Sequence, residues 1–316
     1  MRPRGRQWLL VAGLIALLLA GPLTAKALFW GHPEEPVGAL LCVAAVVLAA
    51  RGRIGLAGVS LGLALATKQW ALLAVVPVLW AAPRGRLRLA TVAACVAAVF
   101  MLPMLIGDPA RFLAPYFNVG GVAGHPIKTS GVTPTNIWFA YGIDNGESLT
   151  GTGHTYAIPA GLASISRPLM LLLGIGLALL FWRFAKRRPP SDALLVLALV
   201  FLLRCLMDPL AMSYHHVPFL VTVAAWETLR RRGLPVITVY SALALWALGR
   251  WVAPTGDGVA MNRAYLAWAL PIAAYMAIKA FRTRASSDQS AGESPKPAVR
   301  GFIPTGSPPA SWSSPS

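Results

Sequence analysis

The chain alternates between long apolar runs and short clusters of arginine and lysine. Of its 316 residues, 56% are hydrophobic and 12% are charged, whereas charged residues make up about 25% of a soluble domain. A soluble core of this size cannot bury so much apolar surface. The sequence therefore predicts an all-α fold, a polytopic bundle of transmembrane helices.

The apolar runs predict ten spans. The run over residues 54–82 is too long for one straight helix of about 20 residues, and basic clusters flank it on both sides. We therefore expect two short helices there, with the tip of their hairpin at residues 67–70. The expected spans lie at residues 9–30, 36–50, 54–82 (crossing twice), 89–106, 168–184, 193–206, 217–226, 234–251 and 264–280.

The basic clusters predict the orientation, because arginine and lysine gather in cytoplasmic loops. With ten spans every cluster falls on one side, which places both termini in the cytoplasm of a multi-pass protein of the cell membrane. This placement accounts for the net charge of +17 without a nucleic-acid partner. The clusters lie at residues 2–6, 51–53, 84–88, 183–188, 230–232 and 279–284. The acidic residues expected on the outer side are Glu34, Glu35, Asp108, Asp144, Glu147, Asp208 and Asp257.

The N-terminus has a second interpretation. A basic start, an apolar run and the sequence Ala25-Lys26-Ala27 together resemble a signal peptide with its cleavage site. Against this, Leu28-Phe29-Trp30 carries the apolar run past the cleavage site, and further apolar runs follow. A first transmembrane helix is therefore favoured.

Two segments are polar. Residues 107–167 are rich in Gly, Pro, Ser and Thr and form the longest predicted outer loop, part of which we expect to fold back over the mouth of the bundle. Residues 282–316 are rich in Ser and Pro and predict a disordered cytoplasmic tail. The expected organisation is a transmembrane domain over residues 1–281, followed by this tail.

The unusual polar residues gather on the predicted outer side. The turn over residues 31–36 places two carboxylates at the edge of the bilayer, where desolvation is costly unless the group reaches water or has a function. The hairpin tip and the segment around residues 204–216 add cations, histidines and aromatic rings. The candidate site residues are His32, Glu34, Glu35, Lys68, Gln69, Trp70, Arg204, Asp208, Tyr214, His215 and His216.

Several of these residues have two interpretations. Arg204 and Asp208 are four residues apart, so they either form an ion pair along a helix or Arg204 binds a phosphate group. Lys68 is either the charged tip of a hairpin or a second phosphate-binding cation. His215 and His216 are adjacent and point apart in regular structure, so contacts with phosphate or sugar hydroxyls are favoured over a metal site. We predict no metal and no cofactor.

Such a set of side chains suits the transfer of a sugar from a lipid-linked sugar phosphate. Cations hold the phosphate leaving group, and a carboxylate accepts the proton of the acceptor hydroxyl as this hydroxyl attacks the anomeric carbon. Aromatic rings stack on the sugar faces. The donor reaches the site from the bilayer.

Three sequence pieces together resemble glycosyltransferase family 87, integral membrane proteins of the GT-C superfamily. The pieces are Gly31-His32-Pro33-Glu34-Glu35, Thr67-Lys68-Gln69-Trp70 and Ser213-Tyr214-His215-His216. The resemblance extends roughly over residues 8–280. It implies an inverting hexosyltransferase, in particular a mannosyltransferase, that uses a polyprenyl-phosphate sugar donor and a glycolipid or polysaccharide acceptor in an actinobacterial cell envelope.

The resemblance also shows a departure. Family members usually carry a large first outer loop with an aspartate taken to be the catalytic base, whereas here that loop is residues 31–36 and no Asp precedes Asp108. We therefore expect the chain to be truncated at the N-terminus. Either Glu34 or Glu35 is then the catalytic base, or the chain lacks one.

Two rival functions are compatible with the sequence. A lipid or solute transporter should carry charged or broken spans at the bilayer midplane, often in two related halves, and neither is evident. A non-catalytic membrane partner, with the scaffold but without the base, agrees with the missing aspartate.

Overall fold

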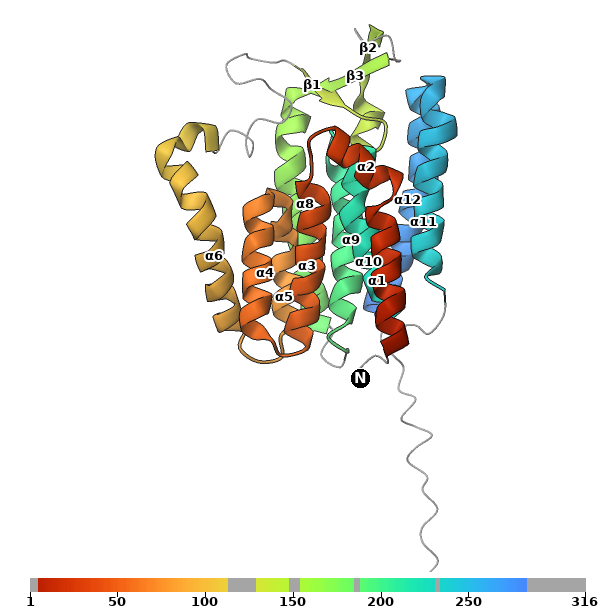
Figure 1. The fold of residues 1–316 in the computed structure, drawn as a ribbon. Helices are drawn as coiled ribbons and strands as arrows, with labels where there is room; N and C mark the ends of the chain where they lie inside the picture. Colours follow the sequence, from red (N-terminus) through yellow and green to blue (C-terminus); the bar gives the residue numbers. More distant parts are fainter. Residues whose placement is uncertain (1–4, 113–128, 148–153, 185–187, 231–233, 283–316) are drawn as a thin grey trace, which may run out of the picture. The chain divides into compact units, whose positions relative to one another are not determined.

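The computed structural model describes residues 5–112, 129–147, 154–184, 188–230 and 234–282. Helices pack side by side in a bundle, with a small sheet at one end (Figure 1). The helices are α1 Gly5–Leu19, α2 Pro22–Phe29, α3 Glu34–Ala50, α4 Ile54–Thr67, η1 Gln69–Ala74, α5 Val75–Ala81, α6 Arg86–Gly107, η2 Ile137–Tyr141, α8 Ala160–Phe184, α9 Asp192–Met207, η3 Ser213–His216, α10 Val217–Arg230, α11 Val236–Ala247, η4 Leu248–Val252, η5 Ala253–Thr255 and α12 Gly258–Phe281. The strands are β1 Thr129–Val132, β2 Ile143–Glu147 and β3 His154–Pro159.

Each of the ten predicted spans contains a helix in the described structure. By length and composition, four of the described helical segments can cross a membrane alone: α6, α8, Val236–Thr255 and α12. The bent pair α1–α2 makes a fifth if it counts as one span, whereas α4 and Gln69–Ala81 are apolar but shorter. The structure therefore confirms a helical protein of membrane type, and the length test supports up to five spans.

The predicted first span is not one straight helix. It is broken between α1 and α2, whose axes differ by 47°. Gly21 is extended at the break, and Pro22 begins α2, a position where its missing N–H costs no hydrogen bond. The Thr24 hydroxyl donates to the Leu18 carbonyl across the break at 3.1 Å. This bond holds the two pieces together at a defined angle.

α9 lies in the interior of the bundle. Its side chains are buried on opposite faces, as Leu197 and Leu199, two residues apart, show. A helix that is apolar all round belongs inside a protein. It packs against α8, α10 and α12, while α3 packs against α4 and α10. The same helix therefore carries Arg204, near its C-terminal end, into the core.

α4 and α6 approach each other closely because glycines replace side chains between them. A Cβ built on Gly62 would lie 2.6 Å from the Ala93 carbonyl oxygen and 2.6 Å from the Val96 Cβ, and Gly58 faces Val92 in the same way. In lipid the hydrophobic effect contributes little to helix association, and small residues favour it by allowing the helix backbones to approach closely.

We expect Gly62→Ala to destabilise the protein by about 1–3 kcal/mol, because the added methyl group must push α6 away. Gly55→Ala in the same helix is the control, since its Cβ meets no atom within 4 Å; it should be neutral or slightly stabilising. Thermal unfolding in detergent measures both variants. Equal unfolding midpoints would contradict the close packing.

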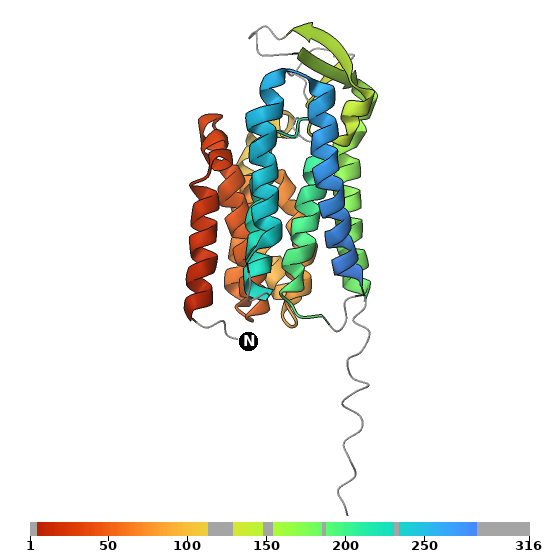
Figure 2. The same ribbon diagram turned by 90° about the vertical axis from the view of Figure 1, so that its right-hand side faces the viewer.

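The described part of the predicted loop 107–167 contains regular structure. Its strands form an antiparallel sheet in the order β1-β3-β2, and α8 begins at Ala160, earlier than expected. Figure 2 shows the sheet over one end of the bundle, above α8 and α12. The Asn136 amide donates to the Pro209 carbonyl at 2.9 Å, and the Asn262 amide donates to the Asn136 carbonyl at 2.8 Å. These bonds tie the segment before η2 to the loop after α9 and to α12.

The two ends of the bundle differ in charge. The loops from α3 to α4 and from α5 to α6 carry basic clusters and lie at one end, together with the end of α8 and the start of α9; we call this the arginine-rich end (Figure 1). The starts of α3 and η1 and the loop after α9 lie at the other end, which we call the mouth. The predicted tail falls outside the described residues, apart from Arg282.

Candidate functional site

Glu34 is a partly exposed carboxylate of the mouth. It begins α3 directly after the turn at Gly31, whose φ of +73° suits glycine. Glu34 Oε1 lies 2.7 Å from Lys68 Nζ and 2.8 Å from His32 Nδ1. The Glu34 side chain keeps 24% of its surface exposed. The turn before α3 and the tip after α4 thus bring one carboxylate between two nitrogen groups.

The Glu34 carboxylate is held in its ionised form. Burial alone would raise its pKa, but the hydrogen bonds from Lys68 and His32 outweigh this effect, and the pKa lies below the usual value. The carboxylate therefore carries its negative charge at neutral pH.

Glu35 lies immediately inside Glu34 and is fully buried. Arg204 binds it with two parallel hydrogen bonds, Nη1 to Oε2 at 3.0 Å and Nη2 to Oε1 at 2.8 Å. The Trp70 indole also donates to Oε1 at 3.2 Å, and its ring packs beneath the Arg204 guanidinium at 4.9 Å. Lys68 Nζ is 3.3 Å from the same oxygen. The pair thus links α3, η1 and α9.

Of the two interpretations of Arg204, the ion pair with Asp208 is wrong, because Arg204 binds Glu35. α9 ends at Met207, and the extended backbone of Asp208 turns its carboxylate away from the helix face. Asp208 Oδ1 instead accepts the Leu210 N–H at 3.1 Å and lies 4.0 Å from Arg167 Nε. Asp208 therefore shapes the loop after α9.

The two adjacent histidines face different surroundings. The Met212 N–H donates to His215 Nδ1 at 3.1 Å, so the other nitrogen, Nε2, carries the proton and points at Glu35 Oε1 from 3.9 Å. His216 Nε2 lies 2.9 Å from the Tyr265 hydroxyl in the interior. Within the described residues, no three His, Cys, Asp or Glu side chains are placed to hold a metal ion.

His215 is neutral at physiological pH. Burial, together with the positive charges of Arg204 and Lys68, holds its pKa well below the usual range. The ring next to it, Tyr214, stacks on His32 with 5.2 Å between the ring centroids. The mouth therefore combines a neutral imidazole and a stacked aromatic pair with the charged groups.

The structure thus brings most of the predicted residues together. The charged cluster contains His32, Glu34, Glu35, Lys68, Trp70, Arg204, Tyr214 and His215. Gln69 is half-buried at the start of η1, and His216 and Asp208 bind other partners. The predicted outer loop also contains His125, Lys128 and His154. His154 pairs with Asp144 at 2.8 Å on the sheet, and His125 and Lys128 fall outside the described residues.

Sequence reasoning missed two polar partners. Tyr265 binds His216 from α12, 49 residues along the chain. Glu227 is buried on α10 and accepts the N–H groups of Ile237 and Thr238, which caps the first turn of α11. The signal for Glu227 was a carboxylate inside an apolar run, which demands a buried donor.

Comparison with known proteins identifies the family. The model of glycosyltransferase family 87 matches residues 1–209, more than half of the chain and a region that includes Glu34, Glu35, Lys68 and Arg204. An alpha-(1->3)-arabinofuranosyltransferase of Mycolicibacterium smegmatis is 28% identical over 142 residues, which are 43% of this chain and 33% of the relative. The aligned region thus spans about a third of that relative's length. No solved structure matches the chain significantly.

The extent of the family match and the apolar helices give the same assignment. This chain belongs to glycosyltransferase family 87, of the GT-C superfamily, and its apolar helices are those of a membrane protein.

Proposed function

We propose that the protein transfers a sugar from a polyprenyl-phosphate donor to a glycolipid or polysaccharide acceptor of the cell envelope. The observation that carries this proposal is Glu34, an ionised, partly exposed carboxylate between Lys68 and His32 at the mouth. In the proposed topology the ten spans cross the plasma membrane with both termini in the cytoplasm, so the mouth faces outward. The basic clusters of the loops lie at the arginine-rich end, as the positive-inside rule predicts for a cytoplasmic side.

Each residue has a distinct proposed role. Lys68 and His32 bind the donor phosphate, whose negative charge replaces that of Glu34 as their partner. Glu34 accepts the proton of the acceptor hydroxyl while the hydroxyl oxygen attacks the anomeric carbon. The bond between this carbon and the phosphate oxygen breaks, the phosphate leaves with the electron pair, and the configuration inverts.

Glu35 has a positioning role in this scheme. Both of its oxygens are bound by Arg204, and Oε1 also accepts the Trp70 N–H. A carboxylate in this state has no free face for a substrate hydroxyl, and it is fully buried. Of the two predicted bases, the geometry favours Glu34.

Two donors are tested. The family resemblance favours polyprenyl-phosphate mannose, whereas the name of the mycobacterial relative favours an arabinofuranosyl donor. Membranes containing the protein are incubated with each radiolabelled donor and with envelope glycolipid. We expect label to enter the acceptor from one donor and to be absent with Glu34→Gln. Lack of transfer from both donors would favour a non-catalytic membrane partner.

We expect the pH dependence of transfer to report the Lys68–Glu34 bond. Because Lys68 lowers the pKa of Glu34, Lys68→Met should raise this pKa. The acidic limb of the kcat/KM profile should then shift to higher pH, since that limb reports the base of the free enzyme.

Lys26→Met is the control for this experiment, because Lys26 is an exposed lysine at the end of α2. It should leave the profile unchanged. An acidic limb that does not move in Lys68→Met would show that Glu34 is not the titrating base.

A further inference from the structure

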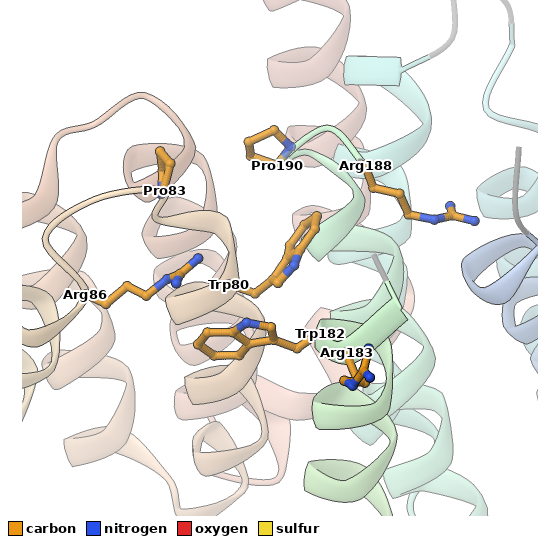
Figure 3. Close-up of a pocket in the computed structure, with 7 residues that line it drawn as sticks. All are labelled: Trp80, Pro83, Arg86, Trp182, Arg183, Arg188 and Pro190. Carbon is orange, nitrogen blue, oxygen red and sulfur yellow. The ribbon is translucent and has the colours of Figure 1, made fainter. Parts of the chain in front are cut away.

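A second charged region lies at the arginine-rich end, between the ends of α5 and α8 and the starts of α6 and α9. It is a pocket of about 490 Å³, within the range of ligand-binding sites. Its lining contains three arginines and no carboxylate among the described residues. The lining residues are Trp80, Pro83, Arg86, Trp182, Arg183, Arg188 and Pro190 (Figure 3).

Arg86 is oriented toward the interior of this pocket. Its Nε donates to the carbonyls of Leu79 at 3.0 Å and Ala82 at 2.9 Å, and its guanidinium lies over the Trp182 ring at 4.8 Å. These contacts fix the planar group and leave both Nη groups without a hydrogen-bond partner among the described residues. Figure 3 shows Arg86 reaching toward Trp80 and Trp182. An oriented guanidinium of this kind matches phosphate oxygens.

The other two arginines differ in how far a neighbouring carboxylate neutralises their charge. Arg188 points away from the tryptophans in Figure 3 and donates to Asp192 at 3.3 Å and to the Lys279 carbonyl at 3.2 Å. Arg183 is exposed near the end of α8. α6 begins at Arg86 without a side-chain cap, so the positive end of its helix dipole also faces this region. The local field therefore favours an anion.

The surroundings point to a lipid and not to a soluble anion. Leu87 follows Arg86 and is 82% exposed, and Phe184 follows Arg183 and is 63% exposed. In a membrane these side chains offer apolar surface to acyl chains beside the pocket. Trp80 and Trp182 are of the type that concentrates at the membrane interface, level with the headgroups. A free phosphate uses none of these features.

We infer that this pocket binds the phosphate headgroup of an anionic membrane phospholipid. Basic pockets between helices at the cytoplasmic side of membrane proteins bind such headgroups. The site is separate from the charged cluster, because the 16 residues of α9 lie between them and give about 24 Å along the helix. Its occupancy is measured without any transfer reaction, so its failure leaves the proposed function untouched.

Delipidated protein in neutral detergent is titrated with phosphatidylglycerol, and bound lipid is counted by native mass spectrometry. We expect the affinity of the tightest site to fall about tenfold in Arg86→Gln, the size of one lost charge-assisted hydrogen bond. Arg88→Gln removes the same charge from the same helix end but does not line the pocket, so it should bind as the wild type does. Equal affinities of the two variants would overturn the inference.

Two further arms complete the test. Arg183→Gln leaves the bonds from Arg86 to Leu79 and Ala82 intact, and it should also weaken binding, which separates lost recognition from lost folding. Phosphatidylcholine should not fill the site, and inorganic phosphate equimolar with the phosphatidylglycerol should not displace it. Displacement by inorganic phosphate would assign the pocket to a soluble anion and overturn the lipid assignment.

Discussion

Glu34→Gln is expected to lower sugar transfer by about 10²- to 10⁴-fold, the usual contribution of a general base. The amide is almost the same size as the carboxylate but cannot accept the proton of the acceptor hydroxyl. The Glu34 side chain is partly exposed, and its bonds to Lys68 and His32 lie at the rim. Expression and unfolding temperature should therefore remain close to the wild type. Transfer in purified membranes, normalised to protein amount, measures the effect.

The matched control for this variant is Asp144→Asn. Asp144 also pairs with a histidine, His154, at 2.8 Å, but it lies on the sheet. Removing this charge tests whether any carboxylate–histidine pair in this half of the chain matters for transfer. Wild-type activity in Glu34→Gln, or an equal loss in Asp144→Asn, would refute the assignment of Glu34 as the base.

Arg204→Met is expected to have the largest effect on stability, about 3–5 kcal/mol. Removing one partner of a buried ion pair leaves the other charge uncompensated. Glu35 would keep its Trp70 bond and the neighbouring Lys68, but it would lose both guanidinium bonds. A thermal or denaturant scan of the wild type and the variant in detergent measures the difference in unfolding free energy.

A double variant separates the interaction energy between Glu35 and Arg204 from the effect of each single substitution. Glu35→Gln combined with Arg204→Met removes both charges, and it should regain most of the lost stability, because neutral replacement of a buried pair costs little. Arg263→Met, an exposed arginine on α12, is the control and should change stability by less than about 0.5 kcal/mol. Additive losses in the double variant would contradict a direct interaction.

The helices were largely predictable, because lipid demands long apolar runs and those runs are visible in the sequence. The pairing of the charged side chains could not be predicted from the sequence. Arg204 and Asp208 have the spacing of a helical pair, yet Arg204 binds Glu35, 169 residues away. In the buried core, Glu35 can bind the guanidinium through both of its oxygens, whereas Asp208 lies beyond the last residue of α9.

The sheet was missed for a different reason. Its strands are short, and Gly131, Gly146 and the surrounding polar residues resemble a loop. They gain their order from outside bonds, such as that from Thr133 N–H to the Pro209 carbonyl at 2.8 Å. Long-range partners of this kind leave no periodic pattern. The polar pieces of the mouth were found because chemically unusual residues stand out in apolar surroundings.

The Glu35–Arg204 pair also bears on biogenesis. Helices enter the membrane in order, so α3 and α4 are present before the ribosome has made α9. During that interval Lys68, which lies 3.3 Å from Glu35 in the finished protein, is already present as a cationic partner. Arg204 then arrives near the end of an apolar helix, and a charged side chain makes the insertion of such a helix into lipid less favourable. Glu35 is already in the membrane on α3 and can pair with Arg204, which offsets this penalty. We therefore expect α3 to assist the insertion of α9.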